Sequence, residues 1–351
     1  MGLQVLANVS LAGQQHQRAI WQQLFPKEFV ALARVQSLET CDPLCMVIYA
    51  CGDGSPELFA QLCSARGITI VKEIVNTTAA VGFGEDSYKL LLSRTCLEGP
   101  YFQSLFSYLG FQAFFLRCIS DILNERLQEI TVPSDLAFCV FGIFKKSIGI
   151  LKCATTGKSG LPTGSSTIDA LGYSLAIPRD ICAQKSVRGS NEDLGDAVDV
   201  LLSHGLIELL LCLLRDLEPT SVMWKAIKQG EERDGPKSSS LKPCPYKGFR
   251  RDMVAVIGNC TYKRKLVQDE IRQRDWILLL LQQCGLDDDN PYLREWGIWC
   301  VRDLFEGNEE NERVVAELEL QGAVDTPEIA QLGLRVEVNP NTRRPRLVNI
   351  S

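Results

Sequence analysis

Residues 247–315 read KGFRRDMVAVIGNCTYKRKLVQDEIRQRDWILLLLQQCGLDDDNPYLREWGIWCVRDLFEGNEENERVV. When this stretch is laid over itself with an offset of about 44 residues, a spacing found in armadillo and HEAT repeats, Met253–Ile271 falls on Gly297–Val315. Apolar residues then coincide with apolar residues. The offset indicates two copies of one helical repeat unit.

The part between the two copies predicts a short helix. Trp276–Leu281 is apolar all the way round, which predicts a helix surrounded by other helices. Asp275 can cap its start and Gly285 can end it. Asn290 and Pro291 then predict the start of the next helix, because Asn caps well and Pro suits the first helical position.

That next helix has one apolar face, with residues spaced at i, i+3, i+4, i+7 and i+11. The face consists of Leu293, Trp296, Gly297, Cys300 and Leu304. The unit therefore contains two helices followed by a longer one, which is typical of armadillo repeats. We predict an all-α, armadillo/HEAT-like helical solenoid for the whole chain.

Three sequence runs resemble the C-terminal domain of the ataxin-10 family: GFRRDMVAVIGNCTYK, LLLQQCGLDDDNPYLREWGIWCVRDLFEGNEENERVV, and the ending LGLRVEV with RPRLV. The match covers roughly the last 100 residues and is specific at the level of whole words. The resemblance implies an association with cytokinesis, cell survival and differentiation signalling.

Three regions follow from the composition along the chain. Residues 1–227 predict N-terminal armadillo-like helical repeats, and residues 246–351 predict the ataxin-10-type C-terminal domain. Between them, residues 228–245 read KQGEERDGPKSSSLKPCP, which is too polar to pack and predicts a surface loop or linker.

In the N-terminal part, Pro and Gly residues predict helix boundaries. Asp42-Pro43 and Ser55-Pro56 each predict a helix start, and Gly67 predicts the end of the second of these helices. Pro178 lies inside a later helical pattern and is expected to kink or divide it.

Two later segments complete the prediction. Asn191 is expected to cap a helix carrying Leu194, and Gly205 is expected to separate it from the next one. After Val315 the helical pattern stops near Gly322. The tail then predicts a hairpin, with a helical cap as the alternative.

Composition limits the classes of function. The chain has 37 Lys and Arg against 43 Asp and Glu, a net charge of −6, which argues against nucleic acid as a partner. The longest apolar stretch, Leu206–Leu214, is too short to insert into a membrane. Fourteen cysteines lie scattered in apolar runs, as buried free thiols do. We therefore expect a reducing cytoplasmic environment, extending to perinuclear or partly nuclear localisation.

The sequence contains no pattern that predicts catalysis, metal binding or cofactor binding. Only two histidines, His16 and His204, could activate a nucleophile or complete a zinc site. Gly157-Lys158-Ser159 mimics the end of a phosphate-binding loop, but Lys152 stands where the pattern needs glycine. The sequence thus predicts no enzyme, no metal and no cofactor.

Asn259, Trp296, Trp299 and Asp303 are the candidate protein-binding residues. Armadillo proteins that hold extended peptides line their groove with a Trp and, four residues later, an Asn. Here Trp299 is followed by Asp303, and Asn259 is preceded by Ala255, so each unit keeps half of the pair. Alternatively, the tryptophans fill the core and Asn259 fixes a helix end.

We therefore predict a non-enzymatic scaffold that binds other proteins. An import-receptor-like adaptor that recognises basic peptides is the alternative, and an acidic groove would distinguish it. The identity of the partner protein and association with a second copy of the chain stay open.

Overall fold

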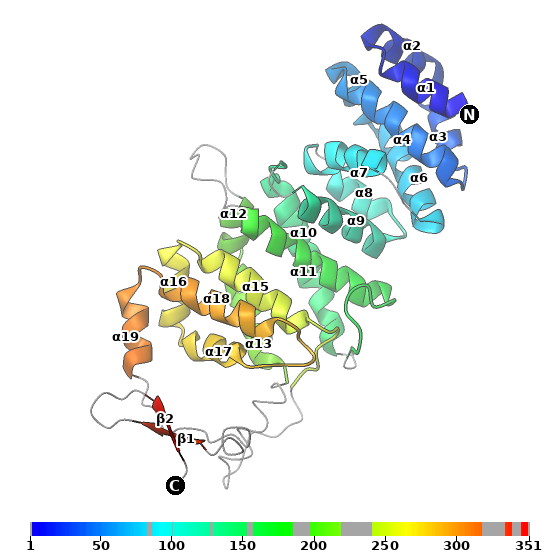
Figure 1. Ribbon diagram of the computed structural model, residues 1–351. Coiled ribbons are helices and arrows are strands. Elements are labelled where there is room, and N and C mark those ends of the chain that lie inside the picture. The colour runs from blue at the N-terminus through cyan, green and yellow to red at the C-terminus, as the bar shows by residue number, and fades with distance from the viewer. Residues whose placement is uncertain are drawn as a thin grey trace.

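The computed structural model describes residues 2–82, 86–99, 101–126, 129–152, 157–184, 197–218, 241–317, 334–338 and 345–349. Its helices follow one another along an elongated body, with the N-terminal helices at one end and the C-terminal ones at the other (Figure 1). Within these ranges, the strands are confined to one C-terminal pair. The fold is an all-α armadillo-like solenoid, as predicted.

The first six helices form the N-terminal end: α1 (Gly2–Ser10), α2 (Gln14–Leu24), α3 (Lys27–Ala33), α4 (Leu38–Asp53), α5 (Pro56–Leu62) and α6 (Ala65–Val81). The start of α5 is confirmed, since the Ser55 hydroxyl accepts a hydrogen bond from the Leu58 amide and Pro56 follows it. The start at Asp42-Pro43 is wrong. α4 begins at Leu38, after the extended Ser37, and continues through Pro43.

Gly67 does not end a helix, contrary to the prediction. It lies in the first turn of α6, which Ser64 caps by accepting a hydrogen bond from the Gly67 amide. A Cβ atom on Gly67 would overlap the carbonyl oxygen of Leu62. Glycine is therefore needed here for the close approach of two helices.

The middle of the chain contains α7 (Asp86–Leu92), α8 (Phe102–Tyr108), α9 (Gln112–Glu125), α10 (Ser134–Ser147), α11 (Ser166–Gln184), α12 (Ala197–Ser203) and α13 (Leu206–Asp216), with a π-helical turn over Ser93–Leu97 and a 3₁₀ turn over Ile148–Lys152. α11 packs along α9 on one side. It runs through Pro178 without division. Gly205 separates α12 from α13 with φ 84°, as predicted, whereas Asn191 and Leu194 lie outside the described residues.

The C-terminal helices are α15 (Phe249–Thr261), α16 (Lys265–Gln273), α17 (Ile277–Leu281), α18 (Leu293–Phe305) and α19 (Glu309–Glu317), with a 3₁₀ turn over Gln282–Cys284. The repeat offset is confirmed. α18 begins and ends 44 positions after α15, and α19 begins and ends 44 positions after α16. The two copies thus fold as equivalent units, and α17 is the short helix between them.

α15 is the most enclosed of these helices. On one side the Cys260 sulfur lies 3.4 Å from the Cys182 sulfur of α11, and on the other a Cβ on Gly258 would lie 3.3 Å from the Cys300 Cα of α18. Buried thiols of this kind were expected, and Cys51, Cys118, Cys260 and Cys300 are indeed buried, while Cys139 and Cys212 are half-buried. The N-terminal and C-terminal parts therefore share one continuous core.

Two expected helix caps in the C-terminal part are wrong. α18 begins at Leu293 rather than at Pro291. The Asn290 side chain instead accepts a hydrogen bond at 3.0 Å from the Arg250 amide, so it caps α15. Asp275 has φ 59°, and Trp276 takes the cap position of α17.

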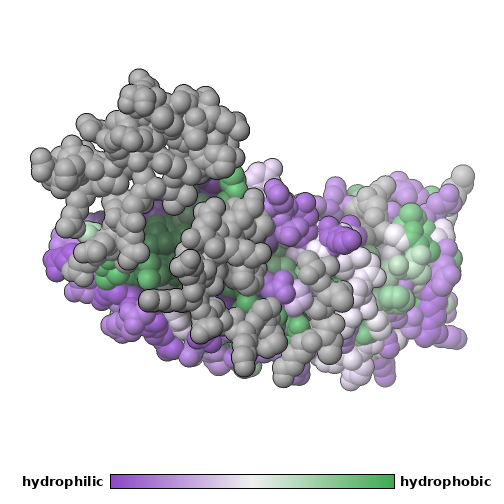
Figure 2. Space-filling view, turned by 90° about the horizontal axis from the view of Figure 1, so that it is seen from below, coloured by the Kyte–Doolittle hydropathy of each residue, from purple (hydrophilic) through white to green (hydrophobic). Residues whose placement is uncertain are grey.

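The all-apolar sequence of α17 predicted a helix surrounded by other helices, and this prediction is wrong. Leu278 is 50% exposed. Apolar side chains gather on the surface over the C-terminal helices (Figure 2). Gly285 does follow the last turn of this segment, as expected.

Residues 228–240 of the predicted linker lie outside the described residues, but Leu241–Pro245 are part of the packed body. Lys242 pairs with Leu217 in a parallel β-bridge. The buried Arg250 guanidinium donates to the Glu218 carbonyl and, at 3.1 Å, to Gln283 Oε1. The two ends of the connection are thus held together, and the domain division stays a prediction.

The C-terminal tail contains an antiparallel pair, β1 (Leu334–Val338) and β2 (Pro345–Asn349). Leu334 pairs with Asn349 and Val338 pairs with Pro345. The predicted hairpin is therefore confirmed over a helical cap.

Candidate functional site

Three of the four candidate residues lie on α18. The Trp296 and Trp299 rings contact edge to face, with centroids 5.3 Å apart. Trp296 is half-buried against the core, whereas Trp299 is 52% exposed. The inward stripe is otherwise as predicted, since Leu293, Gly297, Cys300 and Leu304 are all buried. Trp299 is the candidate residue that offers a surface to a partner.

Asp303 is a structural residue. Its carboxylate accepts hydrogen bonds from Arg302 Nε at 2.9 Å and Nη2 at 2.7 Å, and its carbonyl accepts from Gln268 at 2.8 Å. Burial raises the pKa of Asp303, and the neighbouring Arg302 offsets this only in part. Asp303 therefore does not present a free carboxylate beside Trp299.

Asn259 lies on another face. Its side-chain amide donates to the Arg179 carbonyl at 3.1 Å and so joins α15 to α11. Trp296 and Trp299 meet each other and share α18 with Asp303, whereas Asn259 faces α11. Trp299 of one repeat and Asn259 of the other therefore do not line one common groove.

A buried polar network, not foreseen from the sequence, holds the last repeat together. Gln268 donates to the Thr261, Asp303 and Glu306 carbonyls, at the ends of α15 and α18. Asn308 donates to Gln268 Oε1 at 3.2 Å, and Asn311 donates to the Leu304 carbonyl at 2.8 Å. These side-chain amides donate hydrogen bonds to backbone carbonyls that have no helical partner at the ends of the helices.

Two residues of this network lie in a run of sequence that resembles the family's C-terminal domain. The run GNEENERVV contains Asn308 and Asn311, whose buried side chains make these bonds. Its function in this chain is architectural, because the amides are fully enclosed.

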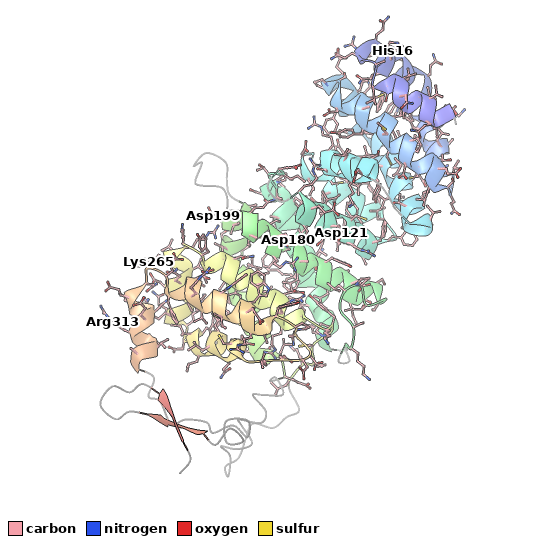
Figure 3. The ribbon with its side chains drawn as sticks, viewed as in Figure 1. His16, Asp121, Asp180, Asp199, Lys265 and Arg313 are labelled. Atoms are coloured by element: carbon pink, nitrogen blue, oxygen red, sulfur yellow. The ribbon has the colours of Figure 1, made fainter. Side chains whose placement is uncertain are left out.

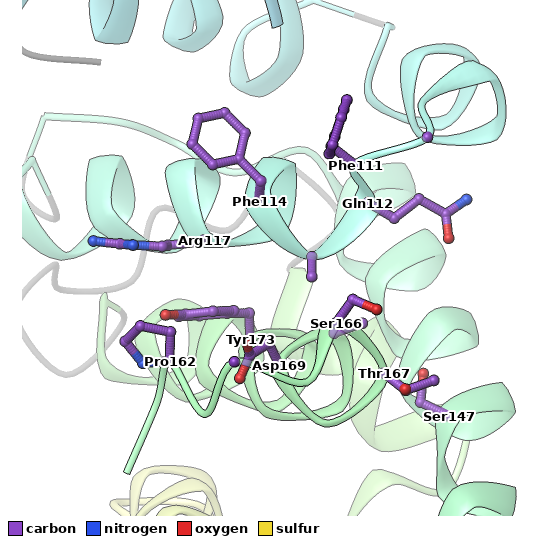
Figure 4. Close-up of a pocket in the computed structure, with 14 residues that line it drawn as sticks. Phe111, Gln112, Phe114, Arg117, Ser147, Pro162, Ser166, Thr167, Asp169 and Tyr173 are labelled. Atoms are coloured by element: carbon purple, nitrogen blue, oxygen red, sulfur yellow. The ribbon is translucent and has the colours of Figure 1, made fainter. Parts of the chain in front are cut away.

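A surface groove runs where α9, α11 and the start of α15 meet, and we call it the polar groove. It consists of two hollows of about 460 and 490 Å³ that share Arg117, Pro162 and Tyr173. In Figure 4, Phe114 and Arg117 of α9 lie on one side of the first hollow, and Pro162 and Tyr173 lie on the other. The second hollow continues to Arg251.

One sequence signal could have revealed this groove. Arg117, Ser120, Asp121 and Asn124 recur at i, i+3, i+4 and i+7 on α9 and line the second hollow. They form a polar stripe on a helix whose apolar face is buried.

Charged groups are concentrated at the end of the groove near α15. Buried Asp252 accepts hydrogen bonds from Arg251 Nη2 at 2.7 Å and from the Tyr246 hydroxyl at 2.9 Å. Arg179 lies 3.6 Å from the same carboxylate and donates to Asp180 Oδ1 at 2.9 Å. These ion pairs hold the two guanidinium groups in place at the groove.

Asp180, labelled in Figure 3, is buried and forms an ion pair at 2.9 Å with Arg179. Its Oδ2 atom is buried and has no hydrogen-bond partner among the described residues. Burial raises the pKa of Asp180 to about 6, although Arg179 favours the ionised form.

The residues that could bind a metal or act as nucleophiles lie apart or buried in the described part of the chain. Within those ranges no three His, Cys, Asp or Glu side chains come together as metal ligands. Both histidines are exposed, and His204 Nδ1 lies 2.8 Å from the Val200 carbonyl at the end of α12. Burial raises the pKa of Cys51 and Cys96 to about 12, so these thiols stay protonated at neutral pH.

No helix in the described part of the chain is long and apolar enough to cross a bilayer alone. Only α12 and α13 taken as a pair, bent by 59°, meet the length and composition that a membrane span requires.

Comparison with known proteins shows similarity to the ataxin-10 family. A model of the spinocerebellar ataxia type 10 protein domain matches residues 249–347. Ataxin-10 from Bos taurus is 26% identical over 354 residues, covering 96% of this chain and 68% of the relative. Residues 249–347 thus match the ataxin-10 domain model, and the chain as a whole is similar to ataxin-10.

Other ataxin-10 proteins match in the same way. Ataxin-10 from Xenopus tropicalis is 22% identical over 340 residues, covering 96% of this chain and 67% of that protein. The ataxin-10 homolog of Dictyostelium discoideum is 38% identical over 95 residues, or 27% of this chain and 16% of that protein. The similarity to ataxin-10 proteins supports a non-enzymatic, scaffold-type protein.

Designed armadillo repeat proteins are among the similar solved structures. A designed armadillo repeat protein in complex with the peptide (KR)4 is 11% identical, with a TM-score of 0.31, covering 86% of this chain and 91% of that chain. A computationally designed armadillo repeat protein for modular peptide recognition is 12% identical, with a TM-score of 0.31 and the same coverage of both chains.

Proposed function

We propose that this chain is a cytoplasmic scaffold that binds other proteins without catalysing a reaction, and that it acts in cytokinesis, cell survival or differentiation signalling. The observation that carries the proposal is the polar groove. Groups from α9, the loop before α11, α11 and the start of α15 converge on it. Grooves along stacked helical repeats are suited to extended partner segments.

The groove's charge does not favour the adaptor for basic peptides. That function calls for acidic residues along the groove, whereas the second hollow is lined by Arg117, Arg179, Lys247 and Arg251 against Asp121 and Asp252. Asp252 is also occupied by hydrogen bonds. A basic peptide would meet cations of its own sign there.

Affinity purification with mass spectrometry, using the full chain, tests the scaffold proposal. We expect at least one protein to co-purify in a stoichiometric amount and to form the same complex when both proteins are purified and mixed. Size-exclusion chromatography with light scattering would measure that complex. The absence of any complex that can be reconstituted would refute the proposal.

A further inference from the structure

We infer that the polar groove binds an acidic peptide segment of a partner protein, with the carboxylates of that segment paired to Arg117, Lys247 and Arg251. This inference rests on the proposed scaffold function and gives the chemical class of its partner. It depends on three features of the groove: its continuity, the state of its cations and the nature of its walls.

The first feature is continuity. The two hollows share Arg117, Pro162 and Tyr173 as lining residues, so they adjoin each other along α9. Together they extend from the start of α9 to the start of α15. A long, open groove of this kind fits an extended chain better than a small molecule.

The second feature is that the groove's cations keep unused donors. Arg251 directs Nε and Nη2 to Asp252, and its Nη1 has no partner among the described residues. Lys247 makes no side-chain hydrogen bond or ion pair within that part of the chain, and its backbone amide is fixed by the Ser159 carbonyl at 2.9 Å. Arg117 lies 3.6 Å from Asp121, and both side chains are about two-fifths exposed.

The acids near these cations are not equally available. Asp252 and Asp180 are buried and already hold the guanidinium groups of Arg251 and Arg179. Asp121 is the accessible carboxylate of the second hollow, and the cations Arg117, Lys247 and Arg251 outnumber it. Carboxylates are the complementary ligands, because charge-assisted hydrogen bonds to guanidinium are short and strong.

The third feature is the mixed character of the walls, which favours peptide over nucleic acid. Phe111 and Phe114 line the first hollow, and Ser120 and Asn124 line the second. Such walls offer apolar contacts and hydrogen bonds to a peptide. A nucleic-acid site would need a longer run of cations and a positively charged protein surface, whereas this chain has a net charge of −6.

Fluorescence anisotropy with labelled model peptides tests the inference on the full chain. The probes are peptides of alternating Glu and Ala, Lys and Ala, or Gln and Ala. We expect the Glu-Ala peptide to bind more tightly than the other two. Arg117→Gln and Lys247→Gln should each weaken its binding about tenfold, since each removes one charged contact.

Arg34→Gln is the matched control, because Arg34 is an exposed cation at the end of α3, outside the groove. We expect it to leave affinity unchanged, and thermal melts would verify that every variant is folded. Tighter binding of the Lys-Ala peptide, or equal affinity in wild type and both groove variants, would overturn the inference.

The same variants separate this inference from the scaffold proposal. If the purified partner complex forms normally with both Arg117→Gln and Lys247→Gln, the acidic-peptide groove is wrong and the scaffold function stands. If no partner complex forms with wild type, the scaffold proposal itself fails.

Discussion

Replacing Asp180 with asparagine should change how the stability of the protein depends on pH. Asp180 is only 6% exposed, accepts hydrogen bonds from Arg179 at Oδ1, and has its Oδ2 buried without a partner among the described residues. The side-chain amide introduced by Asp180→Asn would keep an acceptor for Arg179 and remove the charge. The substitution thus isolates the cost of the buried carboxylate.

The direction in which stability changes with pH follows from the folded and unfolded pKa values of Asp180. The pKa of Asp180 is about 6 in the folded protein, against 3.8 for an unperturbed aspartate, because burial disfavours the carboxylate. The folded state therefore binds the proton more tightly than the unfolded state. Stability from this group is fully present below pH 3.8 and is lost as pH rises towards 6. A difference of about two pKa units corresponds to about 3 kcal/mol.

Urea denaturation of wild type and Asp180→Asn between pH 4 and pH 7 would measure this. We expect the unfolding free energy of wild type, relative to the variant, to fall by about 2.4 kcal/mol across that range, because the unfolded aspartate is already more than half ionised at pH 4. Asp199→Asn, at an exposed position on α12, is the control for general effects of losing an aspartate. A relative stability that stays constant with pH, or that rises, would refute the account of Asp180.

Two further changes test the C-terminal helices. Asn308→Ala should lower the free energy of unfolding by about 2 kcal/mol, because it leaves Gln268 and other enclosed groups without a hydrogen-bond partner. Urea denaturation should show a much smaller loss for the control Asn124→Ala, at the exposed end of α9. Equal losses in the two variants would contradict the structural role of the network. Trp299→Ala should cost only about 1 kcal/mol because half of the ring is exposed, whereas Trp21→Ala, in the core, should cost about 3 to 5 kcal/mol. Thermal melts that rank the two tryptophan variants equally would show that Trp299 is a core residue.

The repeat could be predicted because it depends on local periodicity. Apolar residues at helical spacing decide which face of α18 turns inward, and a second copy of the unit preserves that phase. This is why the 44-residue offset reappears in the bounds of α15 and α18. Leu293, Cys300 and Leu304 could be assigned to the core for the same reason.

Caps and sites were harder to predict because they depend on distant partners. Asn290 precedes α18 in sequence but caps α15, since the fold brings it to the Arg250 amide. The polar groove combines Arg117, Tyr173 and Arg251 from three separate segments. No local pattern shows that such residues will meet.

The β-bridge between Leu217 and Lys242 has a practical consequence for engineering. The Lys242 amide donates to the Asp216 carbonyl at 2.9 Å, and the Glu218 amide donates to the Lys242 carbonyl at 2.9 Å, so both ends of the 219–240 connection are fastened to the body. An insertion between residues 218 and 241 therefore meets two chain ends that the body already holds side by side, so a tag or a fluorescent domain placed there should leave the repeats on either side in register.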